Sequence, residues 1–84
     1  MPYSLNFNKQ AFKELEKIRE PHYSSIKNAI QKLAQNPRPH GYKKLRNRKG
    51  YRIRVGDYRV IYEIFDSILL VEVIDLGNRK EIYD

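Results

Sequence analysis

The sequence predicts an α+β fold in which an antiparallel helical hairpin packs on one face of a mainly antiparallel sheet. Three observations lead to this expectation: an alternating segment opens the chain, two amphipathic segments follow it, and three more alternating segments come after them. The amphipathic segments are 9–19 and 21–35, and the later alternating segments are 51–55, 58–65 and 68–76. Because no linker, repeat or low-complexity stretch divides the 84 residues, we expect a single domain over residues 1–84.

The amino-terminal half contains the first strand and both helices. Apolar and polar side chains alternate over residues 3–7, and Asn8 is suited to cap the next helix by accepting a backbone N–H. Pro21 separates the helices because proline disfavours the helical conformation in the residue before it, and 36–39 ends the second helix. The apolar stripes comprise Ala11, Phe12, Leu15 and Ile18 in the first helix and Ile26, Ala29, Ile30 and Leu33 in the second.

The segment 51–64 predicts a β-hairpin, since Gly56-Asp57 suits the positive φ of a two-residue turn. This register places Arg54 opposite Arg59. One face then carries the side chains that cover a core, namely Tyr51, Ile53, Val55, Tyr58, Val60 and Tyr62. The other face gathers three cations, Arg52, Arg54 and Arg59. Like charges opposite each other destabilise a sheet, by an amount comparable to the roughly 0.2–1 kcal/mol of favourable pairs, so we expect this face to bind a polyanion.

A second turn is expected at 66–67, before the last strand. Continuing the register across it places Tyr62 opposite Val71 and Val60 opposite Val73. The last three strands would therefore form an antiparallel meander.

The positive charge is concentrated in one part of the chain. The 17 Lys and Arg outnumber the 10 Asp and Glu, for a formal net charge of +7. More than half of the cations lie between Arg38 and Arg59, where Asp57 is the one acid. Within this stretch Leu45 is an aliphatic anchor before a basic loop at 46–50. Such clustering favours binding to nucleic acid or to an acidic protein.

Other classes of function find little support. Without cysteine, the chain has no disulfide framework and no thiolate for catalysis or metal binding. His22 and His40 lie too far apart in the sequence to suggest a metal site, so we expect no metal and no cofactor. The longest apolar run, 68–71, is far too short to span a bilayer, and no signal peptide is visible, so we expect a cytoplasmic protein.

The whole chain resembles the RelE/ParE toxins of toxin–antitoxin pairs. The resemblance includes the helical hairpin and the segments Asn36-Pro37-Arg38, Lys43-Lys44-Leu45, 51–62 and 76–83. It implies a RelE-like β-α-α-β-β-β fold, and the basic residues with the ending from Arg79 to Tyr83 imply the RelE branch. Members of that branch enter the ribosomal A site and cut mRNA without a metal, the 2′-hydroxyl attacking its own phosphate.

Arg59 is the central candidate for this chemistry, since a guanidinium fork matches two phosphate oxygens. Alternatively, Arg59 pairs with Glu63 or Glu72 on the same sheet face. Arg52 and Arg54 correspond to a basic pair that is lysine in some members of the family. Arginine, with a pKa above about 12, almost never loses its proton, so we expect Arg52 and Arg54 to stabilise charge and position RNA. The alternative for both is a solvated strand face, chiefly for Arg52.

The resemblance assigns Arg79 to the leaving-group side of the scissile phosphate. Tyr83 is expected to stack on a base, which contributes about 1–3 kcal/mol, or to orient the nucleophile. Alternatively, Arg79 is an exposed cation near the terminus, and Tyr83 is an aromatic side chain that closes the edge of the core. Asn78 stands where many relatives have histidine, so the chain lacks an obvious proton acceptor. Candidate substitutes are a base from ribosomal RNA or Lys43, Lys44, Lys49, His40 and His22.

We therefore expect a type II toxin that is a ribosome-dependent, metal-independent endoribonuclease, cleaving mRNA in the A site by 2′-hydroxyl attack. Its expected partners are the ribosome, mRNA and a cognate antitoxin that is acidic and partly disordered. Ribosomal RNA would be bound through its phosphates by Lys43, Lys44, Arg46, Arg48 and Lys49. Two alternatives stay open: a ParE-like toxin that inhibits DNA gyrase without cutting RNA, or a catalytically weak relative that binds or regulates.

Overall fold

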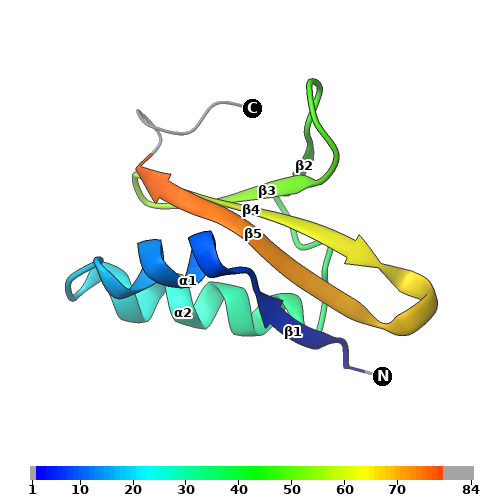
Figure 1. Cartoon of the computed structure of the whole chain (residues 1–84), viewed down its shortest axis with the longest axis horizontal. Coiled ribbons are helices and arrows are strands. Elements are labelled where there is room, and N and C mark those ends of the chain that lie inside the picture. Colours follow the sequence, from blue (N-terminus) through cyan, green and yellow to red (C-terminus); the bar gives the residue numbers. More distant parts are fainter. Residues whose placement is uncertain (1, 79–84) are drawn as a thin grey trace.

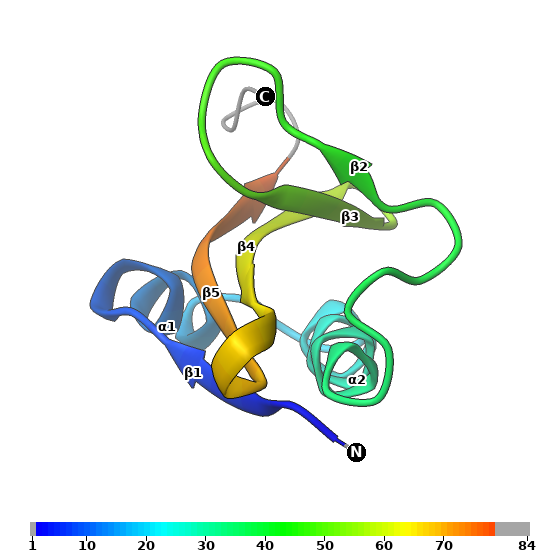
Figure 2. The same cartoon turned by 90° about the vertical axis from the view of Figure 1, so that its right-hand side faces the viewer.

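Two helices cover one face of a five-stranded sheet in the computed structural model, which describes residues 2–78 (Figures 1 and 2). The elements are β1 (Ser4–Phe7), α1 (Lys9–Glu16), α2 (His22–Leu33), β2 (Lys43–Lys44), β3 (Tyr51–Val55), β4 (Tyr58–Phe65), a 3₁₀ turn η1 (Asp66–Ile68) and β5 (Leu70–Asn78). The strand order is β1-β5-β4-β3-β2, with β1 parallel to β5 and the other pairs antiparallel. The predicted α+β class is confirmed.

Helix α1 begins at the predicted residue and α2 one residue later than predicted, and they end three and two residues early. Asn8 caps α1, its side-chain oxygen accepting the N–H of Ala11 at 2.9 Å. After Glu16 the chain tightens, because the N–H groups of Lys17 and Ile18 donate to carbonyls three residues back. The same tightening after Leu33 ends α2.

The main core lies between the helices and the sheet. The predicted inner face of the β3–β4 hairpin is confirmed, with Ile53, Val60 and Tyr62 buried in this core. Strand β5 adds further buried side chains, and both helices contribute their stripes except Phe12, which the sequence predicts to join the core but which is 52% exposed. The core cluster comprises Ala11, Leu15, Ile26, Ile30, Leu33, Ile53, Val60, Tyr62, Val71, Val73 and Leu76.

The predicted register between β4 and β5 is wrong by two residues. Tyr62 lies opposite Val73, because the connection spans η1 and Leu69 rather than two residues. Leu69 adopts the left-handed conformation with φ 51°, which aligns Phe65 with Leu70. A shift of two residues leaves each side chain on its expected face, since the side-chain period is two.

A bulge then changes the pairing beyond Tyr62. Ile61 pairs with Asp75, so Ile74 is an extra residue on β5 and Val60 lies opposite Leu76. Ile74 packs against Leu45 and Ile61 in a second, smaller cluster that is separate from the main core.

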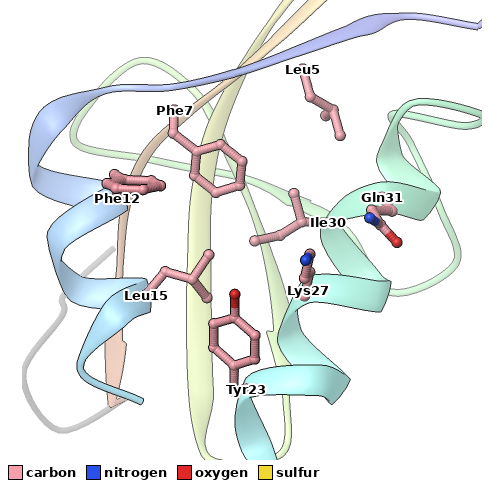
Figure 3. A pocket seen from close by; sticks show the side chains of 8 residues that line it. All are labelled: Leu5, Phe7, Phe12, Leu15, Tyr23, Lys27, Ile30 and Gln31. Carbon is pink, nitrogen blue, oxygen red and sulfur yellow. The ribbon is translucent and has the colours of Figure 1, made fainter. Parts of the chain in front are cut away.

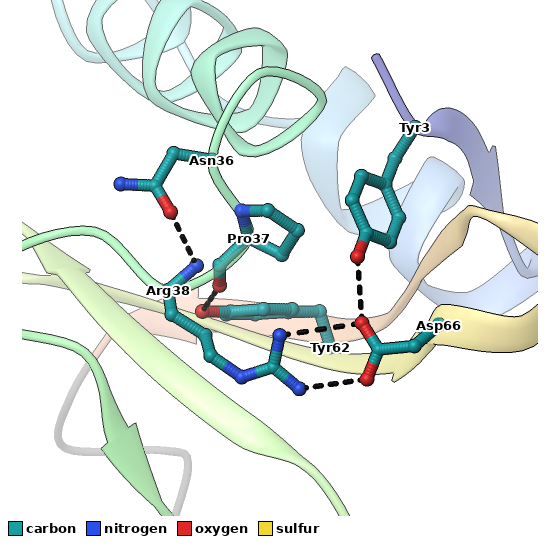
Figure 4. Close-up of polar contacts among 6 residues, drawn as sticks. All are labelled: Tyr3, Asn36, Pro37, Arg38, Tyr62 and Asp66. Carbon is teal, nitrogen blue, oxygen red and sulfur yellow. Dashed lines mark hydrogen bonds and ion pairs between the residues drawn. The ribbon is translucent and has the colours of Figure 1, made fainter. Parts of the chain in front are cut away.

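Polar contacts join three distant segments at one end of the sheet (Figure 4). The Arg38 guanidinium donates to both carboxylate oxygens of Asp66, at 2.9 and 3.3 Å, and the Tyr3 hydroxyl donates to Asp66 at 2.6 Å. Tyr62, from within the core, donates its hydroxyl to the carbonyl of Pro37 at 2.7 Å. These contacts hold the connection after α2 and the amino terminus of β1 against the turn between β4 and β5.

Asp66 should make the stability of the fold depend on pH. Hydrogen bonds from Arg38 and Tyr3 lower the pKa of Asp66 below its usual value. The ionised Asp66 therefore stabilises the fold fully above the ordinary carboxyl pKa of about 3.9. This contribution is lost as the pH falls through the lower pKa of Asp66 in the folded protein. We expect the difference in unfolding free energy between the wild type and Asp66→Asn to shrink between pH 7 and pH 3.

Denaturant titrations at each pH would measure this difference. Glu16→Gln, at the exposed end of α1, is a control for the removal of one negative charge. A constant difference for Asp66→Asn across the pH range would contradict the assignment.

Candidate functional site

The sheet face opposite the helices carries Arg52, Arg54 and Arg59, which we call the arginine face. The predicted hairpin register is confirmed: Arg54 lies opposite Arg59, and Arg52 lies opposite Ile61. Directly opposed side chains share a face, with Cβ atoms about 4.5–5.5 Å apart. Two guanidinium groups therefore extend from neighbouring positions at the end of the hairpin nearest its turn. Such a pair can contact the oxygens of one phosphate group.

The three arginines differ in exposure. Arg54 is exposed and Arg59 is half-buried, whereas Arg52 is only 4% exposed. The alternative of a solvated strand face is therefore wrong for Arg52. In the row formed by Arg54 and Arg59, the position on β5 is Gly77, which has no side chain to cover the pair.

The face also carries acidic residues: Asp75 lies opposite Ile61, in the row of Arg52, and two others lie at the far end. Glu63 lies four residues beyond Arg59 on β4, about 13 Å away at ~3.3 Å per residue. It lies opposite Glu72, whose carboxylate accepts a hydrogen bond from Asn6 at 3.2 Å. Neither glutamate is adjacent to Arg59 in the sheet, so the geometry does not favour the predicted alternative of an ion pair with Glu63 or Glu72.

Strand β2 divides two neighbouring lysines between the faces of the sheet. The sequence predicts only a polar stretch here, because two residues are too few to reveal an alternating pattern. Lys43 lies opposite Arg52 and therefore belongs to the arginine face. Lys44 lies opposite Tyr51, on the face that the helices cover, so the two lysines cannot contact one RNA surface in the same way.

The basic loop 46–49 extends from the sheet on the side away from the helices (Figures 1 and 2). The N–H of Leu45 donates to the carbonyl of Gly50 at 3.0 Å, which closes the loop. Its cations Arg46, Arg48 and Lys49 are exposed. This placement supports the predicted role of the three residues in binding a polyanion.

Two contacts fix the loop to the sheet. Leu45 is buried against Ile61 and Ile74 on the arginine face. Gly50 has φ 114° and lies so close to β4 that an added Cβ would stand 2.8 Å from the carbonyl oxygen of Tyr62. The approach of the two backbones therefore requires glycine at position 50.

Replacement of Gly50 by alanine should destabilise the fold more than the same change at Gly41. Both glycines have positive φ, but a Cβ at Gly41 meets nothing within 4 Å. The strained conformation costs alanine about 1 kcal/mol or more at either site, and the clash with Tyr62 adds to it only at position 50. Chemical unfolding of both variants measures the difference, and equal losses would contradict the close contact.

Several predicted residues lie away from the arginine face. His22 packs against Tyr58 with ring centroids 5.5 Å apart, on the helix-covered side, and His40 lies in the exposed connection before β2. Asn78 pairs with Tyr58 and so points to the same side as Tyr58 by register. Arg79 and Tyr83 lie outside the described residues, and their roles stay predictions.

Arg38 has a role that the sequence does not reveal. It belongs to the basic stretch, yet its guanidinium binds Asp66, 28 residues away in the sequence, and lies 5.9 Å from the ring of Tyr51. The hydrogen bonds to Asp66 raise its pKa further above the usual value. This cation therefore stabilises the fold.

An apolar groove lies on the opposite side of the molecule, between the helices and β1 (Figure 3). It has a volume of about 220 Å³, and its lining includes Leu5, Phe7, Leu15 and Ile30. Phe12 at this groove is 52% exposed. The sheet separates the groove from the arginine face, so a ligand bound in the groove would not touch Arg52, Arg54 or Arg59.

Within residues 2–78, no group of three or more His, Cys, Asp or Glu side chains is arranged to hold a metal ion. In the same part of the chain, neither helix is long and apolar enough to cross a membrane.

Comparison with known proteins identifies the family to which the chain is similar. Residues 5–83 match the family described as the ParE toxin of type II toxin–antitoxin systems, parDE. The mRNA interferase toxin RelE of Escherichia coli K12 is 29% identical over 87 residues, covering 99% of this chain and 92% of RelE.

Two solved structures extend the comparison. The archaeal RelE–RelB complex from Pyrococcus horikoshii contains a chain with a TM-score of 0.83 and 28% identity, covering 98% of this chain and 100% of that one. The toxin–antitoxin complex RelBE2 of Mycobacterium tuberculosis contains a chain with a TM-score of 0.82 and 26% identity, covering 94% and 93%.

Proposed function

Because the chain belongs to the ParE toxin family of type II toxin–antitoxin systems, in its RelE-like branch, we propose that it is a ribosome-dependent endoribonuclease that cleaves mRNA in the A site. The observation that carries this proposal is the pair Arg54 and Arg59, held opposite each other on a sheet face that no helix covers within residues 2–78. Opposed like charges lower the stability of a sheet, whereas a bound phosphate would interact favourably with both.

The proposed reaction is attack of a ribose 2′-hydroxyl on the adjacent phosphate, without a metal. Arg54 and Arg59 bind the non-bridging oxygens and stabilise the extra negative charge of the pentavalent phosphorus. Arg52 lies in the next row of the same face and is buried, so it adds positive potential without needing to contact the RNA. We propose that Arg79 acts on the leaving-group side and that Tyr83 stacks on a base or orients the nucleophile, as the family resemblance implies.

The loop between β2 and β3 is proposed to bind ribosomal RNA through its phosphates. Arg46, Arg48 and Lys49 extend from the sheet, and Lys43 lies at the edge of the arginine face nearest to them. Lys44 would reach RNA only from the other face of β2. Phosphate contacts are independent of sequence and weaken with salt because bound counterions are released.

A cognate antitoxin is the proposed protein partner. The solved relatives from Pyrococcus horikoshii and Mycobacterium tuberculosis are toxin–antitoxin complexes. A net charge of +7 favours an acidic partner, and a partly disordered one could fold over a large part of the basic surface. Such a partner would keep the arginine face from the ribosome.

Arg59→Ala should strongly slow cleavage on ribosomes stalled on a defined mRNA, mapped by primer extension. Loss of an oriented charge at the reacting phosphate is expected to slow single-turnover cleavage by about 10²-fold or more. Arg59→Lys keeps the charge but not the planar fork and should recover part of the rate. Arg19→Ala, an exposed cation after α1, is the control and should cleave like the wild type.

Intact mRNA with the wild-type protein bound to ribosomes would contradict the nuclease proposal. A gyrase supercoiling assay would then test the ParE-like alternative, which the matched family name favours. Inhibition of supercoiling by both the wild type and Arg59→Ala would support that alternative. Inactivity in both assays would leave a binding or regulatory role.

Neutralising the loop should weaken ribosome binding and reduce its salt dependence. In the triple variant Arg46→Gln, Arg48→Gln, Lys49→Gln, each lost phosphate contact lowers the slope of log affinity against log salt by about 0.7–0.9. We expect a slope smaller by about 2–3, measured by titration with labelled ribosomes. The control removes three charges from the exposed helix surface: Lys9→Gln, Lys13→Gln and Lys32→Gln. Equal effects in both triple variants would show that net charge alone matters.

A further inference from the structure

Lys43 stands in a row of side chains that crosses the sheet. The register places Lys43 of β2 opposite Arg52 of β3, which lies opposite Ile61 of β4 and, beyond it, Asp75 of β5. Lys43 is exposed, whereas Arg52 is 4% exposed. The diagonal neighbour of Lys43 on β3 is Arg54, with a distance of about 7–8 Å between the Cα atoms. At this distance the two long side chains can contact the same phosphate group.

The packing of β2 holds Lys43 on this face. Leu45, two residues further on, points to the same side and is buried against Ile61 and Ile74. A slip of one residue between β2 and β3 would remove Leu45 from this cluster and break the hydrogen bond from Leu45 to Gly50. The position of Lys43 is therefore as well determined as that of the buried leucine.

The proposed reaction needs a proton at the 5′-oxygen. An alkoxide is a poor leaving group, and the three arginines hold their protons too strongly to donate one. His22 and His40 lie elsewhere, and Glu63 and Glu72 occupy the far end of the face. Asp75 lies opposite Ile61 on this face, but an ionised carboxylate accepts protons and has none to donate. A lysine ammonium, in contrast, carries a proton at neutral pH and can release it in a transition state.

We propose that Lys43 is a catalytic residue of this cleavage and donates a proton from Nζ to the leaving 5′-oxygen. The 2′-oxygen forms the new bond to phosphorus and loses its proton to water, while the bond from phosphorus to the 5′-oxygen breaks. The products are a 2′,3′-cyclic phosphate and a 5′-hydroxyl, and the neutral amine regains a proton from solvent. This inference rests on the proposed nuclease function.

An mRNA with sulfur in place of the scissile 5′-oxygen tests the proton transfer. A thiolate, with a conjugate-acid pKa of about 8.5, leaves without being protonated. Lys43→Ala should therefore slow single-turnover cleavage of the oxygen substrate by about 10²-fold or more on saturating ribosomes, yet cleave the sulfur substrate almost as fast as the wild type. Lys43→Arg should show the same rescue, because arginine keeps the charge but not a transferable proton.

Lys32→Ala is the control, since Lys32 is an exposed lysine on α2, away from the arginine face. It removes the same charge and is expected to keep the wild-type rates on both substrates. Equal midpoints of thermal unfolding for the three variants would exclude a folding defect as the cause.

Each of three results would overturn the proposal. Equal slowing of both substrates by Lys43→Ala would mean that Lys43 stabilises charge or positions the RNA and does not donate a proton. Unchanged cleavage by Lys43→Ala, in a preparation where Arg59→Ala is strongly slowed, would remove Lys43 from the mechanism and leave the nuclease function intact. A wild type that cleaves neither substrate would refute the nuclease function and this inference with it.

Discussion

The pairing of Arg54 with Arg59 follows from the turn at Gly56-Asp57, where Gly56 adopts φ 60°. Side chains alternate along both strands, so this one register decides which residues enter the core and which form the arginine face. An extra residue in the turn would exchange the two sets. The core and the candidate site therefore depend on the same short segment of backbone.

The energetic cost of the arginine face is small beside the packing on the reverse of the same strands. Opposed like charges cost an amount comparable to the roughly 0.2–1 kcal/mol of favourable cross-strand pairs. A fully buried Val, Ile or Leu contributes about 1.5–3 kcal/mol, and Val60 and Val73 are fully buried on the helix side. One such residue more than offsets the repulsion, so the sheet can keep a cationic face uncovered for a ligand.

Not every cation of the basic stretch belongs to that face. Arg38 binds Asp66 and fixes the ends of three segments, and Lys44 lies on the helix-covered side. Arg52 is buried, while Lys43, Arg54 and the loop cations are exposed. Charge density alone would have treated all of these residues alike, whereas their chemical roles depend on which face and which depth they occupy.

The sequence by itself determined the start of each helix to within one residue, the Asn8 cap, the β3–β4 register and the face on which each of its residues lies. These features depend on neighbours a few residues apart, and alternation, capping and turn chemistry report them directly. The same local pattern identified Arg52, Arg54 and Arg59 as one group, while Arg79 and Tyr83 remain predictions beyond the described residues.

Only the tertiary structure decided the parallel pairing of β1 with β5, the bulge at Ile74 and the separation of Lys43 from Lys44. It also decided the burial of Arg52 and the contact between Arg38 and Asp66. Each of these depends on contacts between residues far apart in the chain, such as Leu45 with Ile61 and Ile74. Neither the two-residue strand β2 nor the left-handed backbone conformation of Leu69 has a local sequence pattern from which such contacts could be predicted.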